Sequence, residues 1–119
     1  MNKYIFIVLA ACALNTAVAL TASAGGKEIF LEKKCNQCHR VTSAGIAPIK
    51  EKDTIIDLSG VGAKYDRDFF HKWLNKETKK PSIVESIKGK QVQHKRKKWD
   101  DSEQALNQLI DWLLTLTEK

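Results

Sequence analysis

The stretch CNQCH, Cys35 to His39, places two thiols two residues apart and an imidazole directly after the second thiol. This spacing is the attachment signature of a c-type haem. Two thiols add to the two vinyl groups of one porphyrin, and the following histidine reaches under the iron. Cys35 and Cys38 are therefore predicted to hold one haem c covalently, with His39 as the proximal iron ligand.

Two other interpretations of these cysteines have to be weighed. A thioredoxin-like redox pair is expected in a βαβ context, which the flanking sequence does not indicate. A zinc site would need further ligands, and only two other histidines are present, His71 and His94. A disulfide between Cys35 and Cys38 would close too short a loop to add much stability.

The first 24 residues differ in composition from the rest of the chain. They begin with Lys3, continue as an apolar run from Tyr4 to Leu20 and end in the small residues Ala22 to Ala24. This order is typical of a cleaved secretory signal peptide. Its removal leaves 95 of the 119 residues and lowers the formal charge from +6 to +5. We expect a signal peptide at 1–24, a single mature domain at 25–119 and a periplasmic location in a bacterium.

Two alternatives for this segment imply a membrane-anchored protein that faces the periplasm. The apolar run would serve as an uncleaved anchor if it reached about 20 residues. The stretch LAAC, Leu9 to Cys12, is similar to a lipoprotein processing box. Membrane contact is expected only if the segment is uncleaved or lipidated.

The remainder of the chain has the pattern of an all-α protein. From Asp100 onward, apolar residues recur at helical spacing: Leu106, Leu109, Ile110, Leu113, Leu114 and Leu116. Asp100, with Glu103 three residues later, is the expected N-cap of this last helix. No run alternates long enough to predict a strand. A hydrophobic content of 43% over 119 residues allows one globular domain.

At these residues the chain resembles the class I cytochrome c family. The resemblance covers most of the mature chain: GGKEIFLEKKC before the motif, DLSGVGAKY in the following irregular segment from Val41 to Lys64, YDRDFFHKWLN as a middle helix and DDSEQALNQLIDWLLTLTEK as the last. It implies a cytochrome c fold, in which the N- and C-terminal helices pack around one covalently bound haem. It also implies one-electron transfer rather than enzymatic catalysis, as a carrier or as a subunit of an oxidoreductase complex.

The sequence departs from this family at the sixth iron ligand. A class I cytochrome c supplies a methionine from a loop before its last helix, but the only methionine here is Met1. His94 lies in the corresponding loop, whereas helical geometry turns His71 away from the apolar face of the middle helix. A histidine is preferred to a lysine because deprotonating an amine at pH 7 costs about 4 to 5 kcal/mol, against a few tenths for an imidazole. A lysine ligand or an open position remains as an alternative, with these lysines as candidates: Lys88, Lys90, Lys95, Lys97 and Lys98.

The ligand set separates two functions. Ligation by two histidines predicts a lower reduction potential than ligation by histidine and methionine, because a thioether raises the potential. This suits a low-potential electron carrier. The alternative is a module that binds or senses CO or NO, in which the distal ligand is displaced by the gas.

Four cations directly follow His94: Lys95, Arg96, Lys97 and Lys98. Beside an exposed haem edge they would steer an acidic redox partner into place, although a solubilising surface has the same composition. Export argues against a nucleic-acid partner.

The sequence also predicts contacts for Trp73 and Trp112. Trp73 resembles the family's middle-helix tryptophan, whose ring N–H bonds a haem propionate, with plain core packing as the alternative. Trp112 is expected to contact the first helix at Phe30.

Overall fold

The computed structural model describes residues 25–118, so the predicted signal peptide at 1–24 lies outside the described residues. The α-helices are α1 (Gly26–Glu32), α2 (Val61–Lys64), α3 (Arg67–Leu74) and α4 (Glu103–Thr115). Short 3₁₀ turns are η2 (Cys35–Gln37), η3 (Thr42–Ala44) and η4 (Glu85–Ile87). The strands are β1 (His39–Arg40), β2 (Ile56–Asp57), β3 (Lys80–Pro81) and β4 (Gln91–Val92). Within the described part, no helix has the length and apolar character that crossing a membrane requires.

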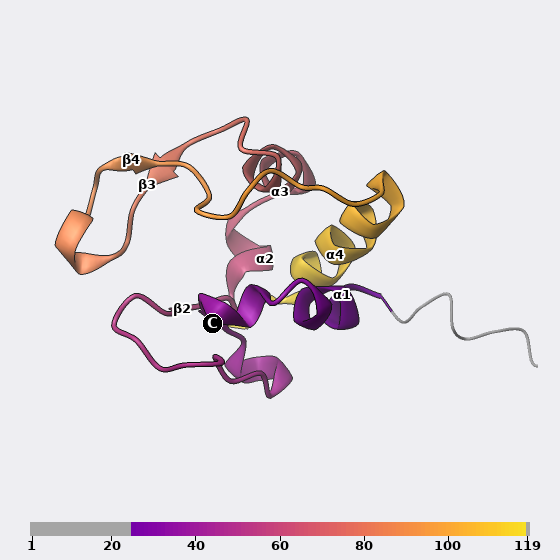
Figure 1. Ribbon diagram of the computed structural model, residues 1–119, viewed down its shortest axis with the longest axis horizontal. Helices are drawn as coiled ribbons and strands as arrows, with labels where there is room; N and C mark the ends of the chain where they lie inside the picture. Colours follow the sequence, from indigo (N-terminus) through magenta and orange to yellow (C-terminus); the bar gives the residue numbers. More distant parts are fainter. Residues whose placement is uncertain (1–24, 119) are drawn as a thin grey trace, which may run out of the picture.

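The core is built where α1 and α4 cross, side by side in Figure 1. Gly26 permits the close approach, because a Cβ at this position would lie 2.1 Å from the Cβ of Trp112. Phe30 is 2% exposed and its ring centroid lies 5.2 Å from that of Trp112. The predicted contact between Trp112 and the first helix is therefore confirmed. The buried apolar cluster consists of Ile29, Phe30, Val41, Ile46, Phe70, Leu106, Leu109, Ile110, Leu113 and Leu116.

The last helix begins later than predicted. Its N-cap is Ser102, whose hydroxyl accepts a hydrogen bond from the Ala105 amide at 3.1 Å. The expected cap, Asp100, instead forms ion pairs with Lys33 and Lys97. The prediction was wrong by two residues because a distant lysine offers Asp100 a partner that local sequence does not reveal.

Helices α2 and α3 both pack against α4. Helix α3 matches the predicted middle helix and is capped by Asp66, whose carboxylate accepts from the Phe69 amide at 2.8 Å. The segment predicted as irregular contains α2, where the Gly62 amide donates to the Leu116 carbonyl at 2.7 Å. A side chain at Gly62 would collide with the α4 backbone, since its Cβ would lie 2.5 Å from the Leu114 carbonyl oxygen.

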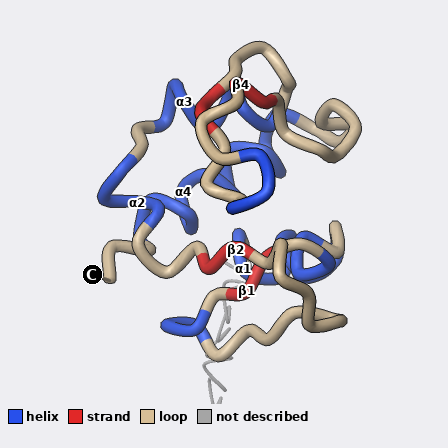
Figure 2. The backbone as a smooth tube through the Cα atoms, turned by 90° about the vertical axis from the view of Figure 1, so that its left-hand side faces the viewer, coloured by secondary structure: helices blue, strands red, loops and turns tan. Residues whose placement is uncertain are grey.

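Two small sheets modify the all-α prediction. Strands β1 and β2 pair in parallel, with His39 opposite Ile56, and β3 and β4 pair antiparallel, with Lys80 opposite Val92. Figure 2 shows these short strands in red among helices and loops. Helices nevertheless make up most of the regular secondary structure of the described residues. Two-residue strands are too short to leave an alternating pattern in the sequence.

Candidate functional site

A cavity of about 260 Å³ contains all five residues predicted to bind the cofactor. Cys35 and Cys38 come from the segment after α1, His39 from β1, Trp73 from α3 and His94 from the loop after β4. Cys35 and Cys38 form no disulfide in the described chain. Much of the remaining wall is apolar: Phe30, Leu58, Val61, Tyr65, Phe69, Phe70, Leu74, Ile83, Val84, Ile87, Val92, Leu109 and Leu113. Such a lining suits a large apolar cofactor with a few polar contacts.

The two cavity histidines have the spacing of ligands that share one metal ion. The ring centroids of His39 and His94 are 6.4 Å apart and their planes differ by only 6°. Metal–imidazole bonds of about 2.0 to 2.1 Å on opposite sides of one ion would place two centroids about 6.3 to 6.4 Å apart. The site therefore fits a haem iron between these rings.

His39 is oriented by the neighbouring strand. Its Nδ1 lies 3.3 Å from the carbonyl oxygen of Ile56, which can only accept, so the proton resides on Nδ1. This leaves the lone pair of Nε2 for a metal, the arrangement that metal-binding histidines usually have. Burial lowers the pKa of His39, against the Ile56 hydrogen bond that raises it, and the nearby Lys80 charge lowers it further.

His94 is held differently. Its Nδ1 is buried and has no hydrogen-bond partner in the described chain. Burial, followed by the positive charges of His39 and Arg96, lowers the pKa of His94 to about 4. The imidazole is therefore neutral at pH 7, the form that offers a lone pair to a metal. Trp73 packs beside it, with ring centroids 5.5 Å apart.

The thiol chemistry disfavours the redox-pair interpretation. Burial raises the pKa of Cys35, although the adjacent Arg96 opposes that rise. Catalytic redox cysteines have a lowered pKa instead. Between residues 25 and 118, no three His, Cys, Asp or Glu side chains are grouped so that they could hold a metal ion.

The other candidates for the sixth ligand lie mostly outside the cavity. His71 is on α3, with its Nε2 2.6 Å from a carboxylate oxygen of Glu103 on α4. Of the five candidate lysines, Lys95 alone lines the cavity within the described residues.

Lys80 is a cavity residue that the sequence did not predict. Its Nζ lies 5.2 Å from the Trp73 ring centroid and 5.9 Å from that of Tyr65. Burial, followed by the charge of Lys64, lowers the pKa of Lys80. Only the pairing of β3 with β4 brings this lysine to the cavity, so no local signal would have identified it. The indole N–H of Trp73 makes no hydrogen bond to the described chain, and its predicted propionate contact stays a prediction.

Comparison with known proteins gives one match. A sequence model of the family described as Cytochrome c matches residues 23–117, which is most of the chain. No curated protein and no solved structure matches the chain.

Proposed function

The chain belongs to the cytochrome c family, whose members bind haem c covalently and transfer electrons, and on this premise we propose that it is an exported, periplasmic carrier of single electrons. Cys35 and Cys38 form the thioether bonds, His39 is the proximal iron ligand and His94 is the distal one. The protein works alone or as a subunit of an electron-transfer complex.

The observation that carries this proposal is the paired arrangement of His39 and His94. Their rings are parallel to within 6° at a centroid distance of 6.4 Å, inside a cavity that also holds both thiols. The bound haem supplies a metal centre that alternates between Fe(III) and Fe(II). Two imidazole ligands on the iron, with no methionine sulfur, favour Fe(III). We therefore expect a lower reduction potential than in cytochromes with His/Met ligation.

The cavity residues keep this centre ready for electron transfer. The Ile56 carbonyl holds His39 with one lone pair directed away from its hydrogen bond. Burial lowers the pKa of the His94 imidazole and so favours the neutral form, which offers a lone pair to a metal. Apolar walls exclude water, which reduces the solvent rearrangement that accompanies a change of charge.

An acidic partner protein docks beside His94 in this proposal. Lys95, Lys97 and Lys98 are exposed and supply the positive charge. Lys97 also pairs with Asp100 at 2.6 Å. Arg96, the fourth cation of this stretch, turns inward and contacts Cys35, so the docking charge rests on the three lysines.

The test compares the EPR and optical spectra of the holoprotein with those of His94→Ala. We expect a low-spin ferric spectrum with two nitrogen ligands in the native protein and its loss in the variant. His71→Ala is the matched control, because His71 pairs with Glu103 outside the cavity. An unchanged low-spin spectrum in His94→Ala would contradict the proposal and make Lys95 the next candidate.

One observation favours a second function, the binding of CO or NO. The Nδ1 of His94 lacks the hydrogen bond that usually strengthens a metal-bound imidazole, so a gas could displace this ligand. Rapid and complete CO binding to the reduced native protein would support this function. Slow or partial binding would support the simple carrier.

A further inference from the structure

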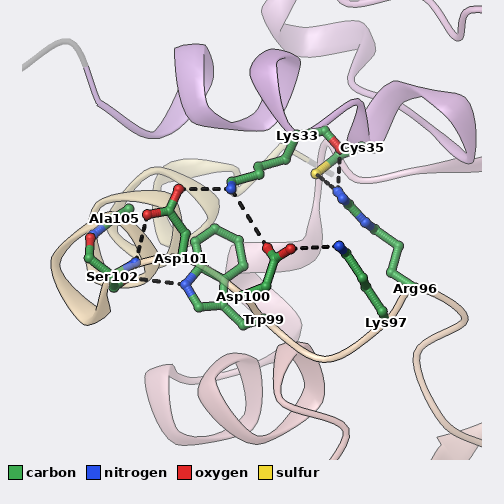
Figure 3. Close-up of polar contacts among 9 residues, drawn as sticks. All are labelled: Lys33, Cys35, Arg96, Lys97, Trp99, Asp100, Asp101, Ser102 and Ala105. Atoms are coloured by element: carbon green, nitrogen blue, oxygen red, sulfur yellow. Dashed lines mark hydrogen bonds and ion pairs between the residues drawn. The ribbon is translucent and has the colours of Figure 1, made fainter.

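Arg96 connects the loop of His94 to the segment that attaches the haem. Its Nη1 donates to the backbone carbonyl of Lys33 and lies 3.5 Å from the sulfur of Cys35. Figure 3 shows the side chain reaching across to both atoms. We propose that Arg96 is the positioning residue that keeps His94 in place as the distal ligand and that also sets a fixed positive charge against the Cys35 side of the haem. This inference rests on the proposed role of His94.

The His94 loop needs such a connection because its backbone is otherwise unsupported. Residues 94–98 make no backbone hydrogen bond to the described chain. On either side, the Gln93 side chain donates to the Lys76 carbonyl at 3.0 Å and the Trp99 amide donates to the Leu74 carbonyl at 3.1 Å. Both bonds attach the loop to the α3 side of the cavity. Arg96 attaches it to the opposite side.

Arg96 is close enough in the chain to His94 to limit the movement of His94. Two residues of extended chain span at most about 7 Å, so anchoring residue 96 restricts how far residue 94 moves from His39. The Nδ1 of His94 makes no hydrogen bond to the described chain that would orient the ring. Its orientation therefore depends on packing and on neighbouring anchors, of which the guanidinium is a charged one.

Lys33 supports the same connection with its side chain. Its Nζ lies 2.7 Å from a carboxylate oxygen of Asp101 and 3.7 Å from one of Asp100, and it lies 5.3 Å from the Trp99 ring centroid. These contacts hold the chain that follows Arg96 against the end of α1, as Figure 3 shows. The carbonyl that accepts from Arg96 and this ammonium group belong to the same residue.

The charge of Arg96 has a separate consequence. A guanidinium is always protonated in proteins, and this one lies beside the sulfur that is proposed to join the haem. A nearby positive charge stabilises the more electron-rich Fe(II) state. Arg96 is therefore expected to raise the reduction potential above the value that two histidines alone would set.

The experiment uses the holoproteins of Arg96→Gln, Arg96→Lys and Arg67→Gln. Arg67 also forms an ion pair between elements, with Asp111, but on the α3–α4 surface. Arg96→Gln should bind CO in the reduced state about ten- to a hundredfold faster, the range expected for loss of one charged hydrogen bond, and should have a lower potential. Arg96→Lys should bind CO faster with a potential close to native. Arg67→Gln should leave both quantities unchanged.

The outcomes distinguish this inference from the proposed function. Native EPR without two nitrogen ligands overturns the role of His94 and this inference with it. A normal native spectrum with unchanged CO rates in both Arg96 variants overturns the inference alone. Equal reduction potentials in Arg96→Gln and Arg96→Lys would overturn the charge effect. The two variants differ in the charge at residue 96, and a merely structural role of Arg96 would not give them different potentials. Should Arg96→Gln fail to accumulate, the CO rate of Arg96→Lys decides the positioning role.

Discussion

The two histidines of the cavity are held in opposite ways. His39 is the last residue of the attachment motif and lies in a strand paired with β2, and its ring donates to the Ile56 carbonyl. His94 lies in a loop without backbone hydrogen bonds at residues 94–98 in the described chain, and its buried nitrogen has no partner. In the proposed function, the proximal ligand is oriented by a strand pair and the distal ligand by side-chain contacts between distant segments, such as Arg96 with Lys33. We expect the proximal ligand to stay bound and the distal ligand to be the one that a gas can displace.

The largest effect is expected from removing both thiols, because the haem then loses its covalent attachment beside His39. In Cys35→Ala/Cys38→Ala no covalent haem should be present, and without it the apolar wall of the cavity is left to water, so the chain should lose most of its ordered structure. Haem staining of a denaturing gel and far-UV circular dichroism measure the two effects. Cys38→Ala serves as the control, since one thioether should remain. Haem that stays with the double variant after denaturation would show that other residues attach it.

The contact between α1 and α4 forms the core on which the cavity rests. A substitution in this contact should lower the stability of the fold without changing the proposed iron ligands. Gly26→Ala puts a methyl group where Trp112 already lies and is expected to cost about 1 to 3 kcal/mol of unfolding free energy. Urea unfolding of the holoprotein measures this cost, and the EPR spectrum should remain native. Gly45→Asn is the control, because its site is open and Asn tolerates the positive φ of 70°. A Gly26→Ala protein of native stability would argue against the close helix contact.

The smallest effect is expected at Asp57, which follows the residue that orients His39. Burial raises the pKa of this carboxyl, but hydrogen bonds from Ser59 and Thr42 outweigh it and lower the pKa to about 2 from the ordinary 3.8. Since the folded pKa lies below the unfolded one, the carboxylate stabilises the fold above pH 3.8, and this contribution is lost as the pH falls toward 2.

Melting temperatures measured from pH 7 to pH 2 check this prediction. Asp57→Asn should melt lower than the native protein at pH 7 and should lose less between pH 4 and pH 2. Asp53→Asn, at an exposed position in the loop before β2, is the control and should melt like the native protein across this range. Parallel curves for the native and Asp57→Asn proteins would show that Asp57 contributes nothing to acid stability.

Sequence reasoning was most successful where periodicity and motif spacing act locally. It predicted α1, α3 and α4, and the contact of Trp112 with Phe30. It did not predict the short strands or the inward turn of Arg96, because each of these depends on a partner far along the chain. It placed the cap at Asp100 instead of Ser102 because the contact of Asp100 with Lys33 is also distant in sequence. Lys80 was missed for the same reason.

The attachment motif and the lack of any methionine after Met1 can be read from the sequence alone, since both are matters of residue type and position. Which of the remaining side chains faces His39 depends on tertiary contacts. The local sequence does not show which histidine or lysine reaches the cavity, because the surroundings of each are formed by elements distant in the chain. The pairing of β3 with β4, the approach of α3 and the reach of Arg96 to Lys33 bring His94 to 6.4 Å from His39, while His71 pairs with Glu103 elsewhere.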